Sequence, residues 1–444
     1  MPKLRQQSYF SYLFPFLSKA TDFPMNSTEP VTHSPSQQAT HLPAPSPTGE
    51  FIVLVALMMS MTALAIDAVL PAFDMIRADI VMAHPNQAQL LISLLFAGLA
   101  LGQLVSGPLS DALGRKKILY AGLGLFLLGT VLCIFAQDLT ALLLGRFVQG
   151  LGVSGPYICA ISIVRDKFAG RQMAKIMSVV MMIFITVPAL APSIGQAIML
   201  VADWRAIFVF YLIFAAAVIA LIFFRLEETL PREKRIAFSV KAISDGFKTV
   251  ISNRLTAGYT LAMGLFFGCF LGYINSSQQI LQELYGTGKL FTVYFGGLAL
   301  VLGFASFFNS RFVERLGMHF ISRRAIYVII ASSILFLLLQ FFITPALWMF
   351  VIYASILFFS FGLVFGNLNA IAMEPMGHVA GIAAAVIGAS SSLISMGLGT
   401  YIGQAYNQSV MPVTLGFIIV PTLGLLATLW ADGGSKKYSA KHTD

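Results

Sequence analysis

Hydrophobic residues occur along most of this chain in long continuous runs, each about the length of a helix that crosses a membrane. The runs lack the alternation of apolar and polar positions that marks membrane β-strands, so they predict helices. Twelve spans are predicted, at residues 51–73, 87–110, 117–137, 140–164, 173–200, 204–225, 254–283, 290–312, 323–343, 346–372, 379–407 and 410–431. Only Thr344-Pro345 separates spans 9 and 10, and only Met411-Pro412 separates spans 11 and 12, so we expect a turn at each proline.

The composition indicates that lipid surrounds most of the chain. Of 444 residues, 57% are hydrophobic and 11% are charged. A soluble domain carries about 25% charged residues, so the sequence excludes an ordinary globular protein and equally a disordered one. The predicted fold class is an all-α membrane protein with twelve transmembrane helices.

Polar segments divide the spans into two sets of six. The predicted organisation is a disordered cytoplasmic tail at 1–49, a six-helix bundle at 50–225, a cytoplasmic linker at 226–253, a second six-helix bundle at 254–432 and a cytoplasmic tail at 433–444. The segment 111–114 after span 2, Asp-Ala-Leu-Gly, corresponds to Glu-Arg-Leu-Gly at 314–317 after span 8. Two pseudo-symmetric bundles of this kind predict a substrate cavity between them, near the membrane midplane.

The N-terminal tail is rich in Pro, Ser, Thr and Gln, which favours disorder. An apolar patch at 9–17 resembles part of a signal peptide, but Pro15 interrupts it and no small-residue cleavage site follows. The sequence leaves open whether Met1 or Met25 is the true start of the protein.

Basic residues predict the orientation in the membrane. Of the 28 Lys and Arg residues, all but Arg77, Arg146, Arg205 and Lys289 fall on one side of the predicted helices. Basic residues of short loops stay in the cytoplasm, so both termini are predicted to be cytoplasmic. The net charge of +9 is distributed over many loops, and no single basic patch supports nucleic-acid binding.

The sequence offers no residues for catalysis. Cys133, Cys159 and Cys269 all fall within predicted spans, where thiols are apolar packing groups. No group of His, Cys, Asp or Glu has metal-ligand spacing, and no nucleotide-binding loop occurs. The chain is therefore predicted to be no enzyme and to use neither a cofactor nor a metal.

Two charges lie where lipid would surround them. Asp67 falls about two-thirds through span 1 and Arg146 early in span 4. Each costs about 2.5 to 3.5 kcal/mol at the bilayer centre on insertion scales, so the two are predicted to share a cavity or a partner. Burial disfavours an ionised carboxylate and a nearby cation favours it, so Asp67 is a candidate proton carrier. The alternatives are an Asp67 hydrated near the outer face, and an Arg146 that neutralises helix ends at the cytoplasmic side.

Span 7 contains aromatic and neutral polar residues instead of charges. Positions 266, 270, 273 and 277 lie near one helical face, which could present aromatic surface and hydrogen-bonding groups to a drug-sized ligand. The candidate lining residues are Phe266, Tyr273, Asn275 and Gln278. Helix packing is the alternative role for them.

Two further spans contain small or helix-bending residues. Pro188, Pro192 and Gly195 in span 5 predict a bend or a close-contact seam. Gly381, Gly388 and the alanines between them in span 11 predict close approach of another helix.

The loop after span 2 resembles the signature of the major facilitator superfamily. Its residues Gly107, Asp111, Gly114, Arg115 and Lys116 correspond to a motif that forms a cytoplasmic latch between the two halves in that family. The glycines permit a tight turn, and Asp111 can pair with local bases or face a helix N-terminus.

Other motifs resemble the drug:proton antiporters of this superfamily. The segment 144–150 around Arg146 is similar to the span 4 signature, whose arginine is associated with proton coupling, and 188–195 is similar to the antiporter signature of span 5. The segments 67–71 and 374–381, the second with His378, resemble the bicyclomycin and chloramphenicol resistance (Bcr/CflA) group. The resemblance covers residues 51–432.

The resemblance implies a proton-coupled antiporter that exports small amphipathic drugs, of the phenicol or bicyclomycin kind or several kinds, by alternating access. It is expected to lie in a bacterial inner membrane, to be driven by the proton gradient, to contact membrane lipid and to act as a monomer. The alternatives are a proton-coupled importer of a small nutrient, which the same fold would serve, and a non-transporting membrane receptor or scaffold.

Overall fold

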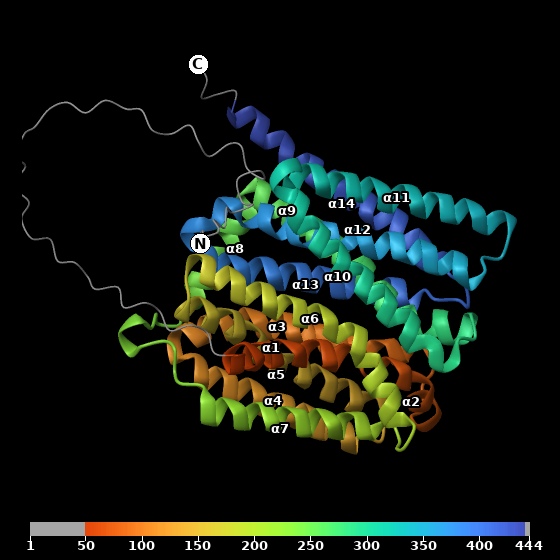
Figure 1. The fold of residues 1–444 in the computed structure, drawn as a ribbon, viewed down its shortest axis with the longest axis horizontal. Helices are drawn as coiled ribbons and strands as arrows, with labels where there is room; N and C mark the ends of the chain where they lie inside the picture. Colours follow the sequence, from red (N-terminus) through yellow and green to blue (C-terminus); the bar gives the residue numbers. More distant parts are fainter. Residues whose placement is uncertain (1–48, 440–444) are drawn as a thin grey trace, which may run out of the picture. The chain divides into compact units, whose positions relative to one another are not determined.

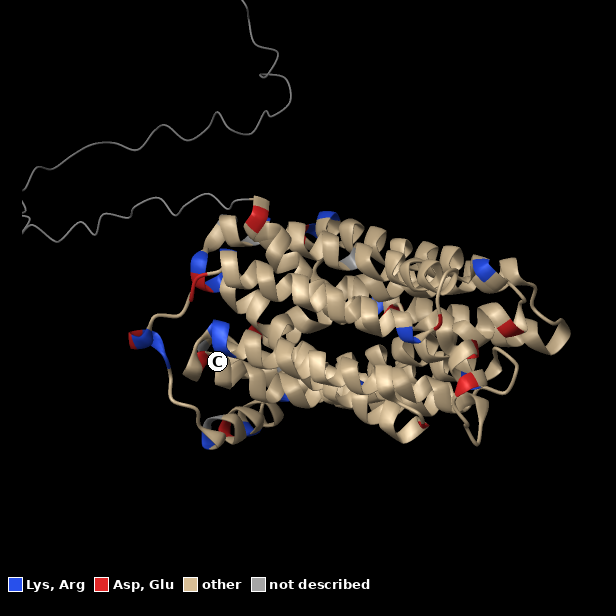
Figure 2. Cartoon of the chain, turned by 90° about the horizontal axis from the view of Figure 1, so that it is seen from below, with Lys and Arg blue, Asp and Glu red and all other residues tan. Residues whose placement is uncertain are grey.

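The computed structural model describes residues 49–439. It contains twelve helices that are long and apolar enough to cross a membrane. No strand occurs within that range, so the all-α prediction is confirmed. The predicted disordered tail, except its last residue, and the choice between Met1 and Met25 lie outside the described residues, as do residues 440–444. Lys, Arg, Asp and Glu gather mainly toward the two ends of the helices (Figure 2).

The first half of the molecule contains six crossings. Its elements are α1 (Gly49–Asp67), η1 (Leu70–Ala72), α2 (Phe73–Asp79), η2 (Pro85–Gln89), α3 (Leu90–Leu113), α4 (Arg115–Phe135), α5 (Leu139–Lys167), α6 (Gly170–Met199) and α7 (Arg205–Arg225). The helix α1, the turn η1 and the helix α2 together form the first crossing. Pro71 in η1 marks the point where the α-helix is interrupted.

The second half also contains six crossings. Its elements are α9 (Arg254–Gln278), the π-helical turn η4 (Gln279–Leu284), η5 (Gly288–Leu290), α10 (Phe291–Leu316), α11 (Met318–Phe342), α12 (Leu347–Met373), η6 (Glu374–Val379), α13 (Ala380–Gln404) and α14 (Met411–Ser439). The helix α3 packs against α13, and α6 packs against α10 (Figure 1). These two helix pairs join the halves.

The internal repeat is visible in the backbone. Gly114 links α3 to α4 with φ 101°, and Gly317 links α10 to α11 with φ 81°. Glycine has no Cβ and adopts positive φ without steric cost. The matching glycines therefore make the same kind of turn in both halves, as the correspondence between segments 111–114 and 314–317 predicts.

The turn between the last two crossings was predicted in the wrong place. The helix α13 ends at Gln404, and the connection occupies residues 405–410. Met411 and Pro412 begin α14, where a proline is tolerated because a first-turn N–H has no helical partner. The join at Thr344-Pro345 does lie between α11 and α12.

The linker is partly helical. Residues 240–252 form α8 (Val240–Ser252), which packs against α13 and α9. Exposed apolar side chains remain on α8, among them Phe247 and Ile251. The first part of the linker contacts the first half, because the Ile236 N–H donates to the Asp111 carbonyl at 3.1 Å. The linker therefore connects the two halves at one end of the helices.

Candidate functional site

We call the end of the bundle that contains Gly114 and α8 the latch end. A cavity of about 510 Å³ lies between the two halves. Its walls are mainly apolar and aromatic, with neutral polar groups among them. Residues of both halves line it, including Gln103, Pro108, Tyr157, Ile161, Met263, Phe267, Phe365, Asn369, Gly388 and Ser391.

The cavity occupies only the latch-end half of the bundle. Its residues on α3 begin at Gln103, and those on α5 begin at Tyr157. On α9 and α13 the lining residues likewise come from the halves of the helices nearest the latch end. Asp111 and the linker segment 236–239 lie at its mouth. In the other half of the bundle, side chains from both halves of the molecule are buried, among them Ile66, Ile92 and Ile274.

The small residues of α13 face this cavity. Gly381 and Gly388 line it together with Ala384 and Ala385, and a Cβ placed on Gly381 would meet open space. The predicted close approach of a helix is therefore absent at Gly381. The small side chains of these cavity-lining residues leave room for the cavity instead. The close approach is present elsewhere on α13, where Ala383 and Ala389 are fully buried and the helix packs against α9 and α3.

Asp67 is the last residue of α1, and its surface is 4% exposed. Within residues 49–439, no hydrogen bond or ion pair engages its carboxyl group. The carboxyl group is thus buried at the point where α1 is interrupted. Hydration near an outer surface, the alternative for this residue, does not describe it in this structure.

Arg146 is completely buried, and each of its three guanidinium nitrogens donates a hydrogen bond. Its Nη2 donates to the Ala65 carbonyl at 2.7 Å, and its Nε donates to the Leu91 carbonyl at 3.0 Å. Its Nη1 donates to Gln149 Oε1 at 2.9 Å. The last carbonyls of a helix have no partners within that helix, so the arginine satisfies one that α1 leaves free.

Asp67 and Arg146 therefore share the last turn of α1 without forming an ion pair. Tyr211 of α7 joins this site, because its hydroxyl donates to the Leu64 carbonyl at 2.9 Å. Arg146 binds the end of a helix, as its alternative role predicted. That helix end lies inside the first crossing, Gly49–Asp79, beyond its middle as counted from the latch end. The cytoplasmic placement given for this role stays a prediction.

The residues of the latch motif form a network around Arg115. Its guanidinium contacts Asp111 at 2.6 Å and Asp166 of α5 at 2.9 Å. Glu228 of the linker accepts from the N–H groups of Arg115 and Lys116 at 2.9 and 3.2 Å. A carboxylate at this place caps the N-terminus of α4.

The hydrogen bonds and ion pairs described for this latch motif stay within the first half and the linker. Gly107 lies on the cavity wall, and Gly114 supplies the turn. Lys116 stands over the ring of Tyr120, 6.0 Å from its centroid. A role of the motif as a latch between the halves stays a prediction. Glu228 was missed, because nothing in the sequence distinguishes it from the acids beside it.

The motif in α6 forms a close seam with α1. Gly195 packs against the backbone of Ala68, where a Cβ would collide with the Ala68 carbonyl. Pro188 and Pro192 lie within the continuous helix α6. The seam thus brings the antiporter-like motif against the interruption that follows Asp67.

The four candidate lining residues of span 7 do not line the cavity. Phe266, Tyr273, Asn275 and Gln278 are all buried, and Tyr273 stacks on Phe295. In this structure they pack between helices, which is the alternative role given in the sequence analysis. Met263 and Phe267, one helical turn apart, face the cavity instead. Aromatic content identified the correct helix, but only packing decides which face of α9 meets the cavity.

Comparison with known proteins decides the family. The model of the Major Facilitator Superfamily matches residues 53–400. The chain belongs to this superfamily. As a superfamily member it is a membrane transporter and not an enzyme.

The relatives of this superfamily member include named bacterial proteins. The chain is 33% identical over 393 residues to an uncharacterized MFS-type transporter, YdgK, of Bacillus subtilis, covering 86% of this chain and 91% of that protein. It is 27% identical over 379 residues to a bicyclomycin resistance protein homolog of Haemophilus influenzae, covering 83% and 93%.

A solved structure shows the same fold. The human organic anion transporter MFSD10 (TETRAN) is similar with a TM-score of 0.64 and 17% identity, covering 86% of this chain and 99% of that one. The similarity confirms a twelve-helix arrangement in two halves for this superfamily member.

Proposed function

We propose that this transporter is a proton-coupled antiporter that exports small amphipathic drugs by alternating access. The observation that carries the proposal is Asp67, a carboxyl group buried beside the interrupted end of α1 without an ion-pair partner. Ionisable groups inside membrane helices are costly, and they mark ion and proton pathways.

The surroundings of Asp67 support a coupling role. Arg146 and Tyr211 bind the carbonyls of the same turn, and Gly195 packs against the next residue, Ala68. A change in the protonation of Asp67 therefore acts on a turn that three other helices contact. The turn can pass this change to the packing of the first half.

The cavity supports an amphipathic substrate. Its deeper wall contains aromatic rings, such as those of Tyr157 and Phe267, and neutral hydrogen-bonding groups, such as those of Gln103 and Asn369. Such a lining binds an apolar body and fixes its polar groups. The similarity to a bicyclomycin resistance protein homolog supports export over import of a nutrient.

The exchange follows from linkage between the two ligands. If a drug binds the deprotonated state more tightly, drug binding promotes proton release by the same factor. The proton and the drug need not touch. In the proposed cycle the latch end faces the cytoplasm. Asp67 takes up its proton when it is accessible from the opposite end of the bundle, and it releases the proton when it is accessible from the latch end.

Replacement of Asp67 by Asn tests the proposal. Asp67→Asn keeps the shape of the side chain and cannot exchange a proton, so proton-driven drug uptake into inverted vesicles should fall at least tenfold. Asp203→Asn is the control, because Asp203 is exposed near the start of α7. Chloramphenicol and a dye cation serve as the probes.

The outcomes separate the possible functions. Uptake of a probe by Asp67→Asn equal to that of the unchanged protein would remove the residue from the mechanism. Nutrient movement in the opposite direction would favour the importer. If the folded and inserted protein moves no probe in a proton-linked way, the result would favour a receptor or scaffold.

A further inference from the structure

At the end of the bundle opposite the latch end, polar side chains join the two halves. Asn86 of η2 is at the centre of this network. Its Nδ2 donates to the carbonyls of Gln404 and Tyr406 at 2.9 and 2.8 Å. Its Oδ1 accepts from Gln279 Nε2 at 2.9 Å. One amide of the first half thus binds two elements of the second.

Further bonds complete the network. Gln404 Nε2 donates to the Asn86 carbonyl at 2.6 Å, and the Tyr406 hydroxyl donates to the Gln279 carbonyl at 3.2 Å. Gln89 is 1% exposed and hydrogen bonds to Gln279. We call these five residues, Asn86, Gln89, Gln279, Gln404 and Tyr406, the polar clasp.

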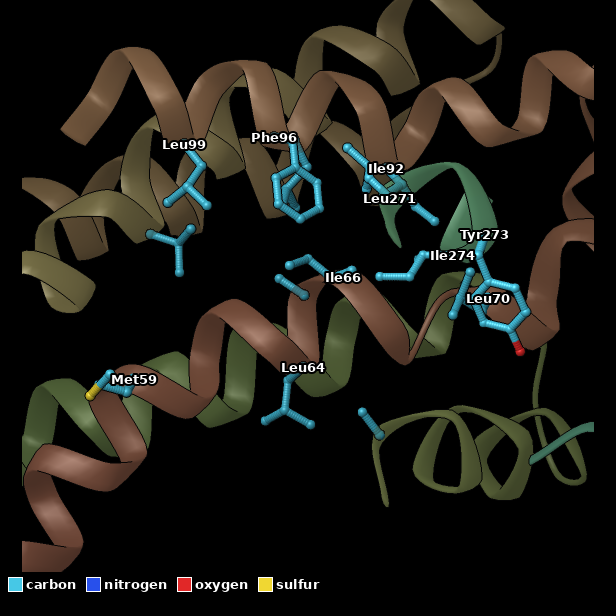
Figure 3. Close-up of a cluster of buried hydrophobic side chains, with 14 of the residues drawn as sticks. Met59, Leu64, Ile66, Leu70, Ile92, Phe96, Leu99, Leu271, Tyr273 and Ile274 are labelled. Atoms are coloured by element: carbon cyan, nitrogen blue, oxygen red, sulfur yellow. The ribbon is translucent and has the colours of Figure 1, made fainter. Parts of the chain in front are cut away.

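An apolar layer lies between the polar clasp and the cavity. Ile66 and Ile92 of the first half meet Leu271 and Ile274 of α9, and each is at most 8% exposed (Figure 3). The layer excludes water from the space between the halves. The polar clasp and this layer together account for the closed half of the bundle.

The chemistry of the polar clasp suits a contact that opens and closes. Its members are uncharged, so they regain hydrogen bonds with water when they separate. An ion pair between Arg77 of α2 and Glu283 of η4 lies beside it, partly exposed to solvent. Partly exposed ion pairs stabilise weakly, so we expect Gln89 and Gln279, the buried amides of the polar clasp, to contribute more to closure than Arg77 does.

The backbone of η4 fits the same role. Gln279 and Glu283, which both contact the first half, belong to a π-helical turn. Isolated π-turns are rare and occur mainly at functional sites. This turn presents both side chains to the first half at the place where α9 ends.

We propose that the polar clasp is the gate of this transporter at the end opposite the latch end, with Asn86 and Gln279 as its principal residues. The gate must open before the cavity can face that end. The inference uses the two-half architecture of the superfamily and is independent of the substrate and of proton coupling.

Thiol labelling in the full-length protein tests the gate without a substrate. Ile274→Cys places a reporter in the apolar layer, in a chain with Cys159→Ala and Cys269→Ala. A membrane-impermeant charged maleimide labels the reporter only when the gate opens. Cys133, which is fully buried within the first half, is kept as a reporter of unfolding.

Asn86→Ala should increase the labelling rate of the reporter about fivefold to tenfold, and Asn86→Asp should do the same because it loses both donors. Asn407→Ala is the matched control, since Asn407 is exposed nearby and accepts a bond from Ser409 alone among the described residues. Arg77→Gln should raise the rate less than twofold.

A cleavable cross-linker gives the opposite perturbation. Asn86→Cys and Gln279→Cys, joined by a short bis-methanethiosulfonate before the maleimide is added, should leave the reporter unlabelled until a reductant cleaves the link and is removed. Cleavage also frees the thiols at positions 86 and 279, so labelling of the reporter is read by mass spectrometry of the peptide that contains position 274. Equal labelling in Asn86→Ala and Asn407→Ala, with Cys133 unlabelled in both, would overturn the proposal. Labelling of the cross-linked protein at the uncross-linked rate would overturn it too.

Discussion

At the scale of single residues, the two buried charges of the first half differ in their hydrogen bonding. Arg146 donates from three nitrogens to three oxygen acceptors, and Asp67 has no such partner among the described residues. A buried cation that donates from all three guanidinium nitrogens is held in place, and removing its partners is costly. We therefore assign Arg146 to the architecture of the site and Asp67 to its chemistry.

Arg146→Lys tests this division. A lysine ammonium is a point charge and cannot reproduce the planar, three-way contact, so the variant should lose about 2 kcal/mol of stability. Thermal unfolding in detergent is the measurement. Arg225→Lys is the control, because Arg225 is exposed and its one described ion pair is with Glu50. An unchanged unfolding temperature for Arg146→Lys would refute the structural assignment.

At the scale of elements, interruptions of helices position the functional groups. The end of α1 frees the Ala65 carbonyl that Arg146 binds, and Tyr211 is a second donor to the Leu64 carbonyl. Gly195 lets α6 approach that interruption. At the latch end, Gly114 turns the chain, and Glu228 binds the first N–H groups of α4. Both places depend on backbone groups that a helix end leaves without partners.

Glu228→Ala should destabilise the latch end. The variant leaves the N–H groups of Arg115 and Lys116 without their acceptor, which costs about 1 kcal/mol for a helix cap. Its unfolding temperature in detergent should fall below that of Glu227→Ala, the adjacent exposed carboxylate. Identical unfolding of the two variants would contradict the capping role.

At the scale of the whole molecule, the two ends of the bundle differ. The cavity occupies the latch-end half, and the polar clasp and apolar layer close the other half. A transporter that alternates must exchange these arrangements. Under the proposed alternating access, the structure represents one of the two states.

The energy of the proposed exchange sets a measurable limit. One proton moving through 100 mV supplies about 2.3 kcal/mol. Because about 1.4 kcal/mol is a factor of ten, one proton per neutral drug sustains roughly a fortyfold concentration ratio. Vesicles with an imposed potential should approach this ratio for an exported probe, and a protonophore should abolish it. A ratio that persists with the protonophore would contradict proton coupling.

The sequence alone determined the class of fold and most of the architecture. Long apolar runs place most of the chain in lipid. In lipid only structures that satisfy their own backbone hydrogen bonds are stable. Twelve helices, two halves and the matching turns at Gly114 and Gly317 follow from local pattern. The two buried charges were also visible, because a charge in an apolar run is rare.

Only the tertiary structure decided which residues meet across the halves. Phe267 lines the cavity and its neighbour Phe266 does not, because the rotation of α9 is set by packing against other helices. Asn86 and Gln279 are far apart along the chain and resemble ordinary polar residues of loops and helix ends. A hydrogen bond between distant segments leaves no local pattern, so their role as a gate emerges only when the fold brings the two halves together.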